Sequence, residues 1–91
     1  MTTQEKEIDK QLLQGYKPDT RTAILNNLYY HFKDYHFLED VNIIGERLQF
    51  WMPEDKEDWI TDWQENSKAI VSGKLRLFLY NVKDGYIVEI Q

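Results

Sequence analysis

The sequence predicts a single α+β domain over residues 1–91, in which helices pack mainly on one face of a four-stranded antiparallel sheet. Two hairpin patterns support this prediction, since runs of β-branched and aromatic residues flank Gly45-Glu46 and, later, Asp84-Gly85. Three other segments have apolar residues at helical spacing. The expected order is therefore α-α-β-β-α-β-β, because two hairpins can merge into one sheet that the helices cover.

The first segment with helical spacing begins at residues 2–5, whose types match a capping box. We expect a short helix from there to about Gln14. Gly15 can take the left-handed conformation that ends a helix, and Pro18 follows three residues later.

A second helix is expected from an N-cap at Asp19 to about Tyr35. Its apolar residues share an arc of about 140° on a helical wheel and should face the core. Tyr30 lies nearly opposite the centre of that arc, so we expect its ring to face solvent or a partner. The residues in the arc are Ile24, Leu25, Leu28, Tyr29 and Phe32.

The first hairpin is built most simply with a two-residue loop at Gly45 and Glu46, because glycine at the first loop position suits a type II′ turn. Pro53 should end its second strand, since proline cannot donate to a ladder. The expected pairs are Ile43 with Leu48, Val41 with Phe50, and Glu39 with Met52. The core face then has Val41, Ile43, Leu48, Phe50 and Met52, and the outer face has Asp40, Asn42, Gln49 and Trp51.

A third helix should follow, with Asp55 as its N-cap and Gly73 just past its end. A competing interpretation exists for residues 68–72, because apolar residues alternate at a spacing of two from Ala69 to Leu79 and fit the start of the last strand. We favour the longer helix. Its core face has Trp59, Ile60, Trp63, Ile70 and Val71.

The terminal hairpin, residues 74–91, allows two registers. A two-residue loop at Asp84-Gly85 would put Tyr80 opposite Glu89, whereas a three-residue loop with Gly85 left-handed would put Tyr80 opposite Val88. We favour the second register, because it makes one face apolar throughout. We expect that face to be buried, with Phe78 and Tyr80 in the core. That face has Phe78, Tyr80, Val82, Tyr86, Val88 and Ile90, and the opposite face has Leu75, Leu77, Leu79 and Ile87.

The charge distribution restricts the class of partner. The formal net charge is −5, and residues 54–66 account for all of it, with six acidic side chains against Lys56. Direct nucleic-acid binding is not expected, because phosphates are neutralised by clustered lysine and arginine. Without cysteine, a secretory signal or an apolar run long enough to span a membrane, we expect a cytoplasmic protein.

No pattern for catalysis, metal binding or a cofactor occurs in the sequence. His31 and His36 diverge by about 140° on a helix, so they cannot grip one metal ion together, and no cysteine could complete a site. Ser67 and Ser72 lie in no nucleophile motif, and there is no glycine-rich phosphate loop. We therefore expect no enzymatic activity, no cofactor and no metal.

Two groups of side chains are candidates for partner binding. Asp58, Asp62 and Glu65 form a stripe opposite the tryptophan face of the third helix. A solvated helix face explains this stripe, and a docking stripe for a basic partner is the alternative. Tyr30 and Trp51 have no evident core position, and both residue types are enriched in protein interfaces.

These features predict a small acidic protein-binding module without enzymatic activity, such as a regulator, an inhibitor or an immunity-type protein. We also expect a homodimer formed through the sheet face that the helices leave uncovered, unless the first helix covers that face. The alternative function is a nucleic-acid mimic, in which the carboxylates of residues 54–66 imitate phosphates in the basic groove of a DNA-binding enzyme. Binding by a mimic should weaken steeply as salt rises.

Overall fold

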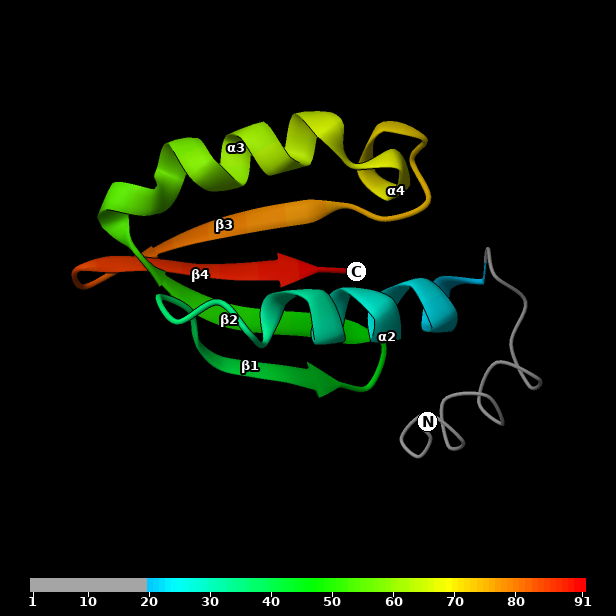
Figure 1. The fold of residues 1–91 in the computed structure, drawn as a ribbon, viewed down its shortest axis with the longest axis horizontal. Helices are drawn as coiled ribbons and strands as arrows, with labels where there is room; N and C mark the ends of the chain where they lie inside the picture. The colour runs from blue at the N-terminus through cyan, green and yellow to red at the C-terminus, as the bar shows by residue number, and fades with distance from the viewer. Residues whose placement is uncertain (1–19) are drawn as a thin grey trace.

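A computed structural model describes residues 20–91 and confirms the predicted fold class (Figure 1). The helix expected over residues 2–14 and the expected cap Asp19 lie outside the described residues. The described elements keep the predicted order: α2 (Arg21–Phe32), β1 (Glu39–Ile44), β2 (Arg47–Pro53), the 3-10 turn η1 (Glu54–Lys56), α3 (Glu57–Asn66), α4 (Lys68–Val71), β3 (Leu77–Val82) and β4 (Gly85–Ile90).

The two hairpins merge through β2 and β4, so the strand order is β1-β2-β4-β3 and every neighbouring pair is antiparallel. In Figure 1, α2 lies over β1 and β2, whereas α3 lies on the β3 side. Buried residues of both helices share one cluster with buried residues of β2 and β4. Both helices therefore pack on the same side of the sheet, which we call the covered face. The opposite side is the open face, and the side chains of each strand alternate between the two.

Phe32, the last residue of α2, lies at the centre of the core and is fully buried. Its ring centroid is 4.8 Å from that of Phe50 on β2 and 4.9 Å from that of Trp63 on α3. Trp59 adds an edge-on contact at 6.0 Å. One aromatic side chain thus joins α2, the sheet and α3.

The boundaries of α2 differ from the prediction at its C-terminal end. Thr20 caps the start, and its Oγ1 accepts a hydrogen bond from the Ala23 N–H at 3.2 Å. The helix was expected to reach Tyr35, but it ends at Phe32. The chain turns there, because the Tyr35 N–H donates to the Phe32 carbonyl, and this turn brings the Tyr35 ring to 5.1 Å from Trp59.

The first hairpin confirms the predicted loop but not the whole register. Ile43 pairs with Leu48 as expected, and Gly45 has the positive φ of +63° that its loop position requires. Nearer the start of β1 the register shifts at a bulge, so Glu39 pairs with Trp51 and the predicted pair with Met52 is wrong. Asp40 lies in this bulge with a φ of +55°.

The third helix is broken in two at Ser67, whose ψ of 123° is extended. Residues 68–71 form the short helix α4, so the strand interpretation of residues 68–72 is wrong, and Gly73 has the expected left-handed φ of +84°. The start also differs, because η1 precedes α3 and Asp55 lies within η1. Since the break redirects the last turn, Val71 is exposed and not on the core face as predicted.

Both predicted registers of the terminal hairpin are wrong. Val82 pairs with Gly85, so the loop is Lys83-Asp84, and Asp84 takes the left-handed φ of +64°. Aspartate tolerates this conformation better than most residues. Gly85 belongs to β4, where it pairs with Pro53 of β2.

This register divides the apolar residues of the hairpin differently from the prediction. Leu77 and Leu79 pair with Ile90 and Val88, and therefore share the covered face with them. Tyr80 pairs with Ile87, and Phe78, Tyr80 and Val82 lie on the open face. Phe78 is 36% exposed, so it is not the core residue that the sequence predicted.

The position of Phe32 leads to a stability prediction. Phe32→Ala should lower the free energy of unfolding by about 3–5 kcal/mol, because it leaves a cavity where two helices meet the sheet. Phe78→Ala is the matched control and should cost about 1 kcal/mol, since the open-face ring is partly exposed and its loss leaves no enclosed cavity. Urea denaturation of both variants measures the difference, and equal losses would contradict the assignment of the two faces.

Candidate interaction surface

The open face carries rows of side chains, because directly paired residues on neighbouring strands point to the same side. The face is apolar near the Lys83-Asp84 loop and becomes polar toward the other end of the strands. From the loop onward, the rows are Pro53, Gly85 and Val82; then Trp51, Ile87 and Tyr80; then Gln49, Glu89 and Phe78.

Exposed apolar surface is concentrated on β3. Among the large hydrophobic residues in the described range, seven are exposed, and four of these belong to β3: Phe78, Leu79, Tyr80 and Val82. Tyr80 is 48% exposed and lies at the end of the row that begins with Trp51. The edge of the sheet and its open face therefore form one apolar surface on this strand.

Trp51 is held in place by Gly85. A Cβ atom at Gly85 would lie 2.7 Å from Cε2 and Nε1 of the Trp51 indole and would also collide with the Met52 carbonyl oxygen. The indole thus lies directly over the Gly85 backbone, which leaves Trp51 half-buried. This contact requires glycine and fixes the position of the ring on the open face.

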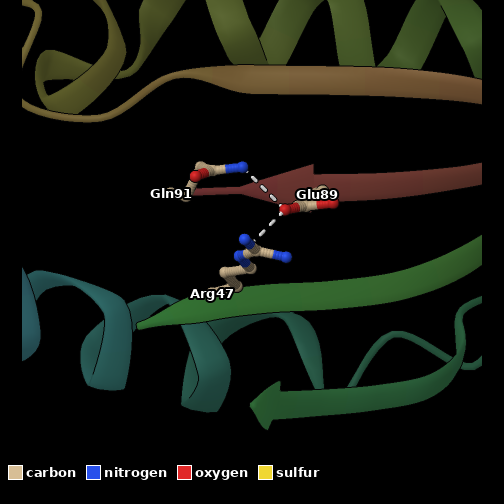
Figure 2. A network of polar contacts seen from close by, with 3 residues as sticks. All are labelled: Arg47, Glu89 and Gln91. Atoms are coloured by element: carbon tan, nitrogen blue, oxygen red, sulfur yellow. Dashed lines mark hydrogen bonds and ion pairs between the residues drawn. The ribbon is translucent and has the colours of Figure 1, made fainter. Parts of the chain in front are cut away.

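A buried carboxylate ends the apolar part of the open face. Figure 2 shows Glu89 Oε2 between two side chains: the Gln91 Nε2 donates to it at 2.7 Å, and the Arg47 Nε lies 3.5 Å away. The Arg47 side chain is 57% exposed, whereas that of Glu89 is 9% exposed. Between residues 20 and 91 this is the one ion pair, and it places a cation at the far end of the face.

The five residues predicted to bind a partner do not form one site. Trp51 lies on the open face, whereas the other four lie on helices packed against the covered face. Tyr30 is exposed on α2 as predicted, with its ring 5.2 Å from that of Tyr29 and 5.3 Å from the Lys33 Nζ. The predicted residues thus belong to surfaces on opposite sides of the sheet.

The acidic stripe, Asp58, Asp62 and Glu65, lies on α3 and is exposed along its length. No ion pair within the described range neutralises it, although Lys68 is close in sequence. The neighbouring Lys56 Nζ lies 4.6 Å from the centre of the Phe37 ring. The stripe therefore keeps its negative charge at the surface.

Tyr86 joins α3 to the sheet. Its hydroxyl donates a hydrogen bond to Glu57 Oε1 at 2.8 Å. This bond to the carboxylate raises the pKa of Tyr86 above 10.0, and desolvation and the negative charges of Glu57 and Glu54 act in the same direction.

A hollow of about 820 Å³ lies between α2 and α4. Ile24 and Leu28 line one side, and Ala69 and Val71 line the other. Most of its exposed lining is apolar, and polar residues, among them Glu65, Ser67 and Lys68, also line it.

The described residues hold no cluster of three or more metal-binding side chains. His31 packs edge-on against Phe32 and Tyr35, and His36 packs against Phe37. None of the helices from residue 20 onward is both long and apolar enough to cross a membrane.

No family model, curated protein or solved structure matches this chain. The evidence for function is therefore the geometry of the surface itself.

Sequence reasoning identified Trp51 but missed the rest of the open face. Tyr80, Phe78 and Val82 were assigned to a buried face, and Ile87 was separated from them. The available signal was that the terminal hairpin is apolar on both faces, so one face had to remain uncovered if the helices lie on one side. Its composition could not be obtained without the registers of β4 with β2 and β3, and the contact of Gly85 with Trp51 and Met52 is not visible in the sequence.

The Gly85 contact predicts a large effect for a small substitution. Gly85→Ala should lower stability by about 1–3 kcal/mol, because the added methyl group meets a backbone carbonyl and a packed indole. Gly45→Ala is a control in open space and should cost about 1 kcal/mol from its positive φ alone. Thermal unfolding compares the two, and a Gly85→Ala variant as stable as its parent would show that β2 and β4 can separate there.

The bond between Tyr86 and Glu57 predicts a pH dependence. The phenol must be protonated to donate, so its contribution to stability is present below the ordinary tyrosine pKa of 10.0 and is lost as pH rises through the higher pKa of Tyr86. Glu57→Gln should lower the Tyr86 pKa toward the ordinary value. Ultraviolet titration, with Tyr86→Phe subtracted to isolate this phenol, measures the change. An unchanged titration curve would contradict the hydrogen bond.

Proposed function

We propose that this protein is a protein-binding module, acting as a regulator, inhibitor or immunity-type protein, and that the open face of its sheet is the contact surface. The supporting observation is the row Trp51, Ile87 and Tyr80, with Val82 and Phe78 on either side. Aromatic side chains of this type supply much of the binding energy in protein interfaces. An apolar patch that a chain leaves uncovered is also characteristic of interaction sites.

The distribution of charge favours a protein ligand on this face. Its apolar end is bounded by Glu89 and Arg47, so a polar rim adjoins an aromatic centre. The acidic stripe lies on the other side of the molecule, on α3, and does not repel a partner at the open face. Self-association through the open face is one form of this function. A substitution at Tyr80, which lies on the open face, tests it.

A second candidate function, a nucleic-acid mimic, is favoured by the exposure of Asp58, Asp62 and Glu65. Their carboxylates are unpaired by any cation of residues 20–91 and so remain available to a basic groove. This surface would act independently of the open face.

Two tyrosines of similar exposure provide the main test. Tyr80 lies on the open face and Tyr30 on α2, at 48% and 52% exposure. In pull-downs from the native host, Tyr80→Ser should lose the captured partner by about tenfold or more, because removal of an interface aromatic typically costs more than 1 kcal/mol. Tyr30→Ser should retain it. The reverse result would move the contact to the helices, and thermal melts confirm that both variants fold.

Salt distinguishes the second candidate. A mimic's complex should weaken steeply between about 50 and 200 mM salt, and the triple variant Asp58→Asn, Asp62→Asn, Glu65→Gln should not bind. A complex that survives high salt and tolerates the triple variant would exclude mimicry.

A further inference from the structure

The two edges of the sheet are built differently. β1 carries Glu39 and Asp40 and is interrupted by a bulge, and charges and bulges are devices that prevent an edge from pairing with another chain. β3, Leu77–Val82, has no charge, no proline and no bulge. One edge is thus protected against further pairing and the other is not.

The backbone groups on the free edge of β3 can be assigned from one pair of hydrogen bonds. Arg76 and Gln91 exchange both bonds, since each N–H donates to the other's carbonyl at 3.0 Å. In an antiparallel ladder such pairs alternate along the strand. The N–H and C=O groups of Phe78, Tyr80 and Val82 therefore point toward β4, and those of Leu77, Leu79 and Asn81 point away from the sheet. Within residues 20–91, no other segment bonds to these outward groups.

The surroundings of this edge indicate the chemistry of a partner. In Figure 1, α3 lies past β3 on the side away from β4, and the contacts of Trp59 and Trp63 with Phe32 place the helix on the covered face. Trp59 and Trp63 of α3 contact Phe32, so the acidic stripe lies on the side of the helix turned away from the core. A strand added to β3 would lie close to this helix, and lysine or arginine in it would be attracted to the stripe.

The same arrangement disfavours a second copy at this edge. Two copies pairing β3 with β3 antiparallel would be related by a two-fold axis beside the strands. Because α3 lies beyond β3, both α3 helices would meet at that axis, each with Asp58, Asp62 and Glu65. Their like charges would oppose the contact.

We propose that β3 accepts an extended, basic segment of a partner protein as an additional strand of the sheet. The outward groups of Leu77, Leu79 and Asn81 supply the backbone hydrogen bonds. Apolar side chains of the added strand lie beside Phe78 and Tyr80 on the open face, and basic side chains lie on the side of α3. This inference rests on the proposed function, and it specifies that the partner's binding segment is extended and basic.

The probe is a synthetic peptide of about eight residues, in which lysine alternates with valine and both ends are blocked. In the free protein, the amides of Leu77, Leu79 and Asn81 should exchange with solvent quickly, while those of Phe78, Tyr80 and Val82 are protected. The peptide should slow exchange at the first set. A peptide with glutamate in place of lysine should lose at least about tenfold in affinity.

Leu79→Pro tests the edge directly. It removes an outward N–H and no bond to β4, so Tyr80 should keep its protection while peptide affinity falls about tenfold relative to Leu79→Ala. If Leu79→Pro does not fold, Asn81→Pro with Asn81→Ala gives the same comparison.

The possible results are separable. No binding at millimolar peptide, equal binding of the two peptides, or protection at other amides would overturn the proposal. If sedimentation shows a dimer and Leu79→Pro dissociates it, the strand that pairs with β3 would be a second copy of this chain and the proposed basic segment would be wrong. If Tyr80→Ser loses a host partner that Leu79→Pro retains, the open-face function would be supported and strand addition would be contradicted. If the peptide adds as a strand but no host partner is sensitive to Tyr80→Ser, strand addition would be supported and the open-face function would be contradicted.

Discussion

The close approach of Gly85 to β2 is the constraint on which the rest of the structure depends. There is no room for a side chain between the Gly85 backbone, the Trp51 indole and the Met52 carbonyl, so this position of β4 beside β2 requires glycine. The register of β3 with β4 then puts the loop at Lys83-Asp84 and determines which residues of β3 face the helices. A one-residue shift in a strand moves every side chain to the other face. The composition of the open face thus follows from the registers of β4 with β2 and with β3.

The two faces of the sheet differ because the described helices, all within residues 20–91, pack on one side of it. On the covered face, Phe32 packs against Phe50, Trp59 and Trp63, and this aromatic core joins α2, β2 and α3. The open face has residues of similar types, yet Trp51 is half-buried over the Gly85 backbone and Tyr80 is exposed. Residues 20–91 therefore carry more apolar surface than their helices cover from one side, and the proposed partner would cover the remainder.

Local patterns were sufficient to predict some parts of the fold and insufficient for others. The first hairpin was predictable because Gly45 specifies its turn, and the alternation of Leu48, Phe50 and Met52 then fixes its core face. The terminal hairpin was not, since Gly85 resembles a turn glycine and its actual requirement is a contact with another strand. The break at Ser67 likewise has no proline or glycine to signal it. Of the candidate site, Trp51 and the exposure of Tyr30 were predictable; the grouping of Tyr80 with Ile87 needed the tertiary register.

The unprotected edge has a consequence for the protein in concentrated solution. Leu77–Val82 is a six-residue, uncharged stretch without proline, rich in residues that favour strands, and such stretches stack readily into fibrils. The chain's net charge of −5 provides the repulsion that keeps molecules apart. That repulsion disappears near the isoelectric point, about pH 4.9. Colloidal stability in this protein should therefore depend on the carboxylates on the helical side, because β3 itself carries no charge, proline or bulge that would prevent pairing.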